Sequence, residues 1–138
     1  MALQLGKTFI NLPVKDLQKS MDFFSAIGFE FNKQFTDDKA TCMIINEHCY
    51  AMLLVEPFFQ SFTSKSLADT TRSTEVIVAL AADSREQVDE IADKAMAAGG
   101  LHSNDPQDLG FMYTRSFQDI NGHLWEVFYM ADPESHQA

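Results

Sequence analysis

Two glutamates, Glu75 and Glu126, lie in short, largely apolar segments that are predicted to be β-strands. Glu126 follows an Asn121-Gly122 turn and is the only acid in the apolar segment 124–129. A carboxylate in such a segment needs hydrogen bonds, a partner cation or a metal ion, because burying it unpaired costs on the order of several kcal/mol or forces protonation. Two such carboxylates could hold a hard cation such as Mg²⁺ or Mn²⁺, with waters completing its coordination shell.

Other polar residues near Glu126 offer alternatives to a metal. Tyr113 and Arg115 lie on the strand expected before the turn, and we expect that they could neutralise Glu126 directly. His123 directly follows the turn glycine, so we interpret it as a turn residue and not as a metal ligand. Cys42 and Cys49 lack a CxxC spacing, and we interpret both as reduced, packed thiols.

The elements that must position these residues are predicted twice along the chain. In the first half, a strand over Thr8 to Val14 precedes a helix that Asp16 opens and Gly28 ends. Three further strands are predicted near 29–35, 40–45 and 50–55. The first half is thus a βαβββ module covering about residues 5–56.

The second half repeats this order. A strand over Glu75 to Leu80 precedes a helix that opens with a capping box from Ser84 to Gln87 and ends at Gly99-Gly100. A short strand near Leu101, a polar loop and strands over 111–117 and 124–129 follow. This second βαβββ module covers about residues 73–131, and a polar tail that we expect to fray follows from 132.

We predict an α+β fold of one domain, residues 1–138, in which two curved mixed sheets form a cleft. An aromatic linker over 57–72 joins the modules and carries Phe58, Phe59 and Phe62, which could form a lid, a subunit contact or part of the core. Strand alternation directs Phe9 and Asn11 to one face of the first strand and Glu75 to the cleft side of the second module.

Composition excludes several classes of function. The formal net charge of −10 disfavours binding to nucleic acid or to an anionic membrane surface. Apolar runs such as Tyr50 to Val55 are too short for a membrane span, and no signal-peptide core is present, so we expect a cytoplasmic protein. No GxSxG, Walker or dinucleotide-binding glycine pattern occurs.

Three segments carry a resemblance that covers nearly the whole chain, namely FINLPVKDLQKSMDFFSAIGFEF, STEVIVALAADSREQVDEIADKAMAAGG and GFMYTRSFQDINGHLWEVFYM. Together with the repeated module, they resemble the vicinal oxygen chelate superfamily of glyoxalases, bleomycin-resistance proteins and extradiol dioxygenases. Within it, they look most like bacterial proteins described as predicted lactoylglutathione lyases. The resemblance implies a small-molecule ligand and a homodimer.

The same resemblance implies a divalent metal held by the first strand of each module and by the last strand. The first-strand position falls on Phe9, which cannot bind a cation, whereas Glu75 and Glu126 match the second and last positions. A fourth position near Tyr50 to Leu54 has no carboxylate or imidazole. The expected cofactor is therefore one Mn, Mg, Ni or Zn ion, or none.

Two main functions follow from these residues. One is a metal-dependent lyase or isomerase in which Glu75 or Glu126 is the catalytic base. The other is a metal-free binding or sequestration protein of the bleomycin-resistance type, and a dimeric scaffold without a ligand is a third hypothesis. The expected ligand-binding residues are Phe9, Asn11, Phe111, Tyr113, Arg115 and Phe128.

Overall fold

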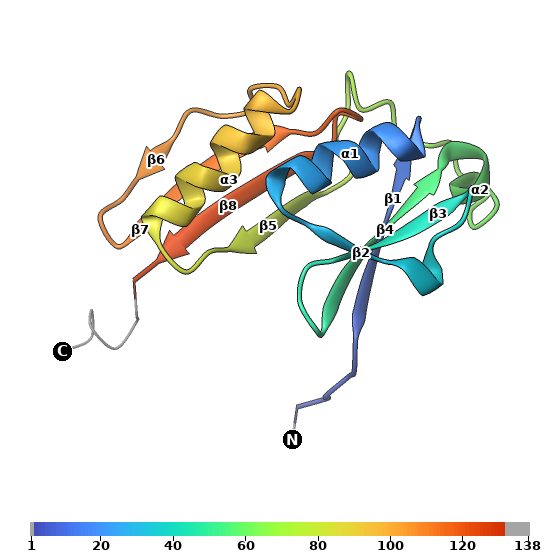
Figure 1. Cartoon of the computed structure of the whole chain (residues 1–138), viewed down its shortest axis with the longest axis horizontal. Helices are drawn as coiled ribbons and strands as arrows, with labels where there is room; N and C mark the ends of the chain where they lie inside the picture. The colour runs from blue at the N-terminus through green and yellow to red at the C-terminus, as the bar shows by residue number, and fades with distance from the viewer. Residues whose placement is uncertain (1, 132–138) are drawn as a thin grey trace. The chain divides into compact units, whose positions relative to one another are not determined.

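The computed structural model describes residues 2–131, so the prediction of a fraying tail lies outside the described residues. The chain divides between Leu67 and Ala68 into two compact units (Figure 1). Each unit is a βαβββ module with its own four-stranded mixed sheet, which confirms the predicted α+β class. That the whole chain acts as one domain stays a prediction.

The first unit contains a sheet of strand order β1-β4-β3-β2 and one long helix. Its first and last strands pair in parallel, with Thr8 opposite Cys49, and the other strand pairs are antiparallel. Its elements are β1 (Thr8–Val14), α1 (Leu17–Ile27), β2 (Glu30–Asn32), the 3₁₀ turn η1 (Lys33–Phe35), β3 (Ala40–Ile44), β4 (Cys49–Val55) and the short helix α2 (Glu56–Gln60).

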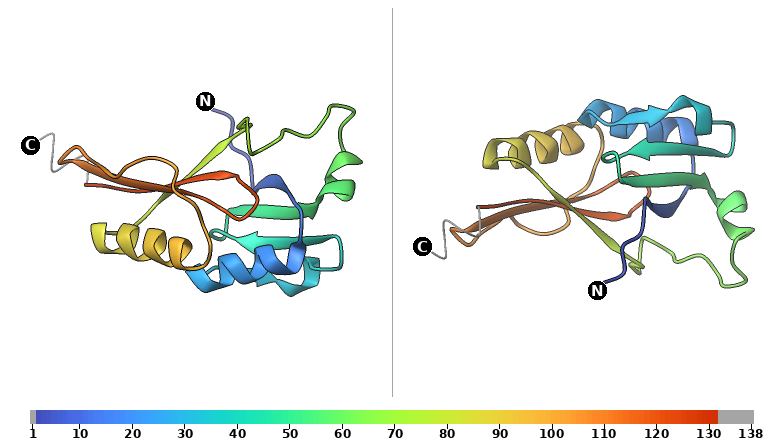
Figure 2. Two further views of the ribbon diagram at one scale, coloured as in Figure 1. Left: turned by 90° about the horizontal axis from the view of Figure 1, so that it is seen from above. Right: turned by 90° about the horizontal axis from the view of Figure 1, so that it is seen from below.

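Helix α1 begins and ends where the sequence predicts. The Asp16 side chain accepts a hydrogen bond from the amide of Lys19, and Gly28 ends the helix with a positive φ of 124°. Helix α1 lies along one face of its sheet (Figure 2), and its Phe24 is fully buried, as are Leu12 and Val14 of β1. Because strand residues alternate between faces, Phe9 and Asn11 project from the opposite face, as predicted.

The second unit has the same plan, with strand order β5-β8-β7-β6 and a parallel pair of first and last strands. Helix α3 packs on one face of this sheet (Figure 2), above the fully buried Phe117, Trp125 and Val127. The elements are β5 (Ile77–Ala81), α3 (Arg85–Ala97), β6 (Gln107–Asp108), β7 (Met112–Gln118) and β8 (Leu124–Met130).

Three element predictions need correction. The strand expected over 29–35 stops at Asn32, because the Asn32 side chain accepts a hydrogen bond from the amide of Gln34 and opens η1. The short strand expected near Leu101 is only an isolated β-bridge between Leu101 and Gln118. The strand between α3 and β7 is instead β6, which lies within the segment predicted to be a loop. The linker begins with the short helix α2 instead of an irregular segment. The ring of Phe58 in this helix contacts the ring of Phe62, just after it, edge to face.

The remaining sequence expectations concern thiols and membranes. Cys42 and Cys49 are both free thiols, and burial raises the pKa of Cys42. Within residues 2–131, no helix has the length and apolar character that crossing a membrane requires.

Candidate functional site

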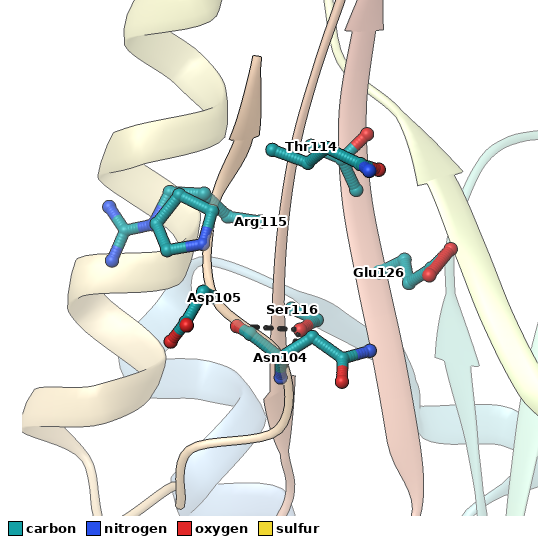
Figure 3. Close-up of a pocket in the computed structure, with 8 residues that line it drawn as sticks. Asn104, Asp105, Thr114, Arg115, Ser116 and Glu126 are labelled. Atoms are coloured by element: carbon teal, nitrogen blue, oxygen red, sulfur yellow. Dashed lines mark hydrogen bonds between the residues drawn. The ribbon is translucent and has the colours of Figure 1, made fainter. Parts of the chain in front are cut away.

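A pocket of about 340 Å³ opens on the sheet of the second unit, beside the loop that leads into β6 (Figure 3). Its volume is at the small end of the range for ligand pockets, roughly 300–1,000 Å³. Most of its lining is polar, and the lining residues are Asn104, Asp105, Pro106, Gln107, Thr114, Arg115, Ser116 and Glu126. We refer to it as the Glu126 pocket.

The antiparallel register of β7 and β8 determines which side chains share the pocket face. Ser116 pairs with Glu126 and Thr114 pairs with Phe128, so these four project from the same side of the sheet. The alternate residues, such as Phe117, are buried beneath α3. Glu126 and Ser116 are thus neighbours on the face opposite to α3.

The loop that forms the other wall is tied to β7 by hydrogen bonds. The amide of Asn104 donates to Ser116 Oγ over 2.9 Å, and Gln118 Nε2 donates to the carbonyl of His102 over 3.0 Å. Farther along, Gln107 pairs with Thr114 in the ladder of β6 and β7. The loop that forms this wall of the pocket is therefore bonded to β7 both before β6 and at β6 itself.

Glu126 is half-buried, and within residues 2–131 its carboxylate has no hydrogen-bond or ion-pair partner. A carboxylate that has lost part of its hydration and gained no protein partner gains free energy when a donor or a cation binds it. The chemistry available at this position is therefore hydrogen-bond acceptance, cation binding or proton transfer.

Tyr113 and Arg115 do not neutralise Glu126, so that expectation is wrong. Arg115 contributes to the pocket lining, but its guanidinium extends toward α3 (Figure 3), where it donates to Asp89 over 3.1 Å and to Asp93 over 2.8 Å. The Tyr113 hydroxyl donates to Asp89 over 2.6 Å. Odd-numbered residues of β7 face the helix, whereas Glu126 faces the other side.

These contacts perturb the titration of the groups between α3 and β7. The hydrogen bond from Tyr113 is the main cause that lowers the pKa of Asp89, and Arg115 adds to the effect. The same hydrogen bond raises the pKa of Tyr113. Both shifts favour the arrangement of an ionised Asp89 and a protonated Tyr113.

The turn before β8 contains a buried polar network that sequence reasoning missed. His123 Nδ1 lies 2.8 Å from Glu75 Oε1, and the imidazole is almost fully buried. Asp119 accepts hydrogen bonds from the Trp125 indole over 2.9 Å and from the amides of Asn121 and His123. Burial raises the pKa of Asp119, and the His123 charge and these hydrogen bonds oppose that shift.

Glu75 and Glu126 do not form a shared metal site. Ala79 is the residue of β5 opposite Glu126. The strand expected over Glu75 to Leu80 begins only at Ile77, and Glu75 lies four residues before Ala79, about 13 Å along an extended chain at about 3.3 Å per residue. Oxygen ligands lie only about 2.0–2.6 Å from Mg²⁺ or Ca²⁺. Glu75 is also engaged by His123. The donor set therefore does not fit an ion held jointly by the two glutamates.

The other expected positions agree with this conclusion. Phe9 lies at the position that the resemblance assigns to the first metal ligand. Its ring is 54% exposed and stacks on Tyr50, with the ring centroids 5.2 Å apart. Among residues 2–131, no cluster of three or more His, Cys, Asp or Glu is arranged to hold a metal ion. We therefore assign no step of any reaction to a metal.

Of the predicted ligand-binding residues, only Arg115 lines the Glu126 pocket, joined by the predicted catalytic Glu126. Phe9 and Asn11 are on the first unit, Tyr113 faces α3, and Phe111 precedes β7 with 47% exposure. Ser116 and Thr114 were missed although their alternation with buried Phe117 indicates the face they share with Glu126. The loop 104–107 has no alternation of buried and exposed residues, so its place in the pocket lining could not be predicted in this way.

Comparisons with known proteins are consistent with this architecture. A family model described as "Glyoxalase/Bleomycin resistance protein/Dioxygenase superfamily" matches residues 8–127. No protein of curated function matches the sequence significantly.

Solved structures with the same fold include hypothetical protein SA1046 from S. aureus, with 28% identity, a TM-score of 0.76, and coverage of 94% of this chain and 95% of that chain. A glyoxalase-related enzyme from Fulvimarina pelagi has 19% identity and a TM-score of 0.77, with coverage of 92% and 88%. The fosfomycin resistance protein FosX from Listeria monocytogenes, solved with Mn(II) and sulfate, has 20% identity and a TM-score of 0.64, with coverage of 97% and 94%.

Proposed function

The chain belongs to the Glyoxalase/Bleomycin resistance protein/Dioxygenase superfamily, and from this membership we propose that it binds a small polar molecule in the Glu126 pocket without a resident metal ion. The observation that carries the proposal is the Glu126 carboxylate, which has no protein partner within residues 2–131 and lines a pocket of about 340 Å³. Binding or sequestration needs only groups that are present: the carboxylate, the hydroxyls of Thr114 and Ser116, and the amides of the loop.

A metal-dependent lyase or isomerase is the second candidate. It is supported by the resemblance, in which Glu126 matches the last-strand acid position, and by the FosX structure from Listeria monocytogenes, which contains Mn(II). The candidate requires further ligands, and Phe9 and the distant Glu75 do not supply them. We therefore favour the binding function, with a homodimer as the proposed assembly, to be checked by light scattering.

The test is a fragment screen by NMR on protein treated with EDTA. Fragments that bind should shift the amide resonances of residues 104–107 and 114–116. Thr114→Trp, which fills the pocket, should weaken this binding at least about tenfold, which corresponds to ~1.4 kcal/mol. Thr74→Trp, an equal increase in size before β5 and outside the pocket lining, is the matched control and should bind like the wild type.

Two results would contradict the proposal. One is the absence of any fragment that shifts the pocket resonances. The other is binding that appears only after Mn²⁺ is added, together with stoichiometric Mn²⁺ in the purified protein and its loss in Glu126→Ala. That second result would favour the metal-dependent enzyme.

A further inference from the structure

The charges around the Glu126 pocket are unequal. The lining contains two carboxylates, Glu126 and Asp105, and one cation, Arg115, and Asp105 lies within hydrogen-bond distance of His102 Nε2, at 3.0 Å. Arg115 is already bound to Asp89 and Asp93 on α3, and its side chain extends away from Glu126 (Figure 3). The lining therefore offers negative charge to a ligand and no uncommitted positive charge.

Arg85 and Lys94, two of the other three cations of the second unit, are occupied as well. Residues 68–131 include eleven Asp and Glu but only four Lys and Arg. Arg85 forms a bidentate pair with Asp108, and Lys94 pairs with Glu90 along α3. Arg72 is outside the pocket lining. The surroundings of the pocket thus add to its negative potential instead of neutralising it.

Neutral polar groups complete the lining. The Thr114 hydroxyl and the side-chain amides of Asn104 and Gln107 have no hydrogen-bond partner within residues 2–131. Ser116 Oγ is held by the backbone of Asn104. These groups can accept or donate hydrogen bonds around a small molecule whose charge is placed at Glu126.

We infer that the ligand of the Glu126 pocket is a small organic cation, an amine or an amidine-like group that donates N–H bonds to Glu126, with further polar atoms that reach Thr114 and the loop 104–107. The inference rests on the proposed function and specifies its ligand class. A planar amidinium or guanidinium suits a carboxylate particularly well, because two parallel N–H groups match the two carboxylate oxygens. An anion would meet the Glu126 carboxylate and a guanidinium that is turned away and already paired.

Three probes of one shape and different charge test the inference: benzamidinium, neutral benzamide and anionic benzoate. NMR titration of the intact protein should show that benzamidinium binds at least about tenfold more tightly than benzamide and that benzoate binds least. Raising the ionic strength should weaken only the benzamidinium interaction, because salt screens the charge pair.

Glu126→Gln keeps the size of the side chain and removes its charge, so it should abolish the preference for benzamidinium over benzamide. Glu86→Gln, on the exposed side of α3, makes the same change in net charge and should retain the preference. Equal binding of the three probes, a preference for benzoate, or an unchanged preference in Glu126→Gln would overturn the inference.

These outcomes can be separated from failure of the proposed function. If benzamide or benzoate shifts the pocket resonances as strongly as benzamidinium, a small molecule binds in the pocket but its class is not cationic. If no probe and no library fragment shifts those resonances, both the ligand class and the binding function are wrong.

Discussion

Asp119 organises the turn that leads into the strand of Glu126. Its Oδ1 accepts from the amides of Asn121 and His123, and its Oδ2 accepts from the Trp125 indole. Every bond uses the carboxylate as an acceptor, and the residue is only 1% exposed. The position therefore requires a side chain with two accepting oxygens.

Asp119→Asn is expected to destabilise the protein although it removes a buried acid. The asparagine has one accepting oxygen, so its NH₂ group would face either the indole N–H or the two amides, and the unpaired donor should cost about 1–3 kcal/mol. Urea denaturation at neutral pH measures this loss. Asp38→Asn, at an exposed residue of the first unit, should change the stability by less than about 0.5 kcal/mol.

The raised pKa of Asp119 also predicts a pH dependence. An acid whose pKa is higher in the folded state holds its proton more tightly when folded, so its contribution to stability declines as pH rises above the ordinary value of 3.8 toward the folded pKa. Asp119→Asn should lack this decline. Identical pH profiles of unfolding free energy for the variant and the wild type would contradict the prediction.

At this scale, sequence reasoning identified Glu126 but assigned it the wrong neighbours. The alternation of Phe117, Trp125 and Val127 already indicates that odd positions of both strands face a core. The same alternation places Tyr113 and Arg115 with the core residues and Ser116 with Glu126. The hydrogen bond between His123 and Glu75 could not be predicted from local sequence patterns, because 48 residues separate the two along the chain.

Helix α3 is attached to β7 by side chains as well as by its apolar face. Asp89 accepts from both Tyr113 and Arg115, and Asp93 accepts from Arg115. The Asp89 side chain remains 48% exposed, so solvent screens its charge interaction with Arg115. The Tyr113 hydrogen bond is the shorter of the two contacts with Asp89, at 2.6 Å against 3.1 Å.

A double-mutant cycle with Tyr113→Phe and Asp89→Asn should show a coupling of about 0.5–1 kcal/mol at neutral pH. The folded pKa of Asp89 is lowered, so its contribution is fully present above the ordinary value of 3.8 and is lost as pH falls through the folded pKa. The coupling should shrink accordingly in acid. Its persistence there would show that the two residues do not interact through the ionised carboxylate.

The element boundaries that sequence reasoning predicted well are those with a local chemical signal. Asp16 and Gly28 bound α1, and Ser84 caps α3 through the amide of Gln87. The second half of that capping box differs slightly, because Gln87 accepts from the amide of Asp83 instead of Ser84. Strand β6 was missed because two polar residues become a strand only through pairing with β7.

At the scale of the whole molecule, all ladders of one sheet are formed within one unit. The first strand of each unit pairs with its last, as β1 with β4 and β5 with β8. The residues between α2 and β5 contain no further helix or strand. Within this segment, the Thr70 hydroxyl donates to the carbonyl of Asn121, and Thr70 leaves no room for a side chain at Gly122.

Limited trypsin digestion should therefore cut the connecting segment first at Lys65 and only later at Arg72. The hydrogen bond of Thr70 to Asn121 holds the chain near Arg72 against the second unit, and within residues 2–131 Lys65 has no such bond to that unit. Intact-mass analysis of early products identifies the cut. Lys19 in α1 and Lys94 in α3 are the internal controls and should resist cleavage until the protein unfolds. A first cut in either helix would contradict this division of the chain.

The register around Glu126 determines which positions could hold further ligands beside it. Ala79 and Ser116 flank Glu126 on the two neighbouring strands and share its face, at the spacing of cross-strand pairs. Two substitutions, Ala79→His and Ser116→His, would align two imidazoles and one carboxylate, a triad that transition metals favour. The register at Glu126 thus already supplies the spacing of such a donor set, and only the side chains on β5 and β7 would have to change.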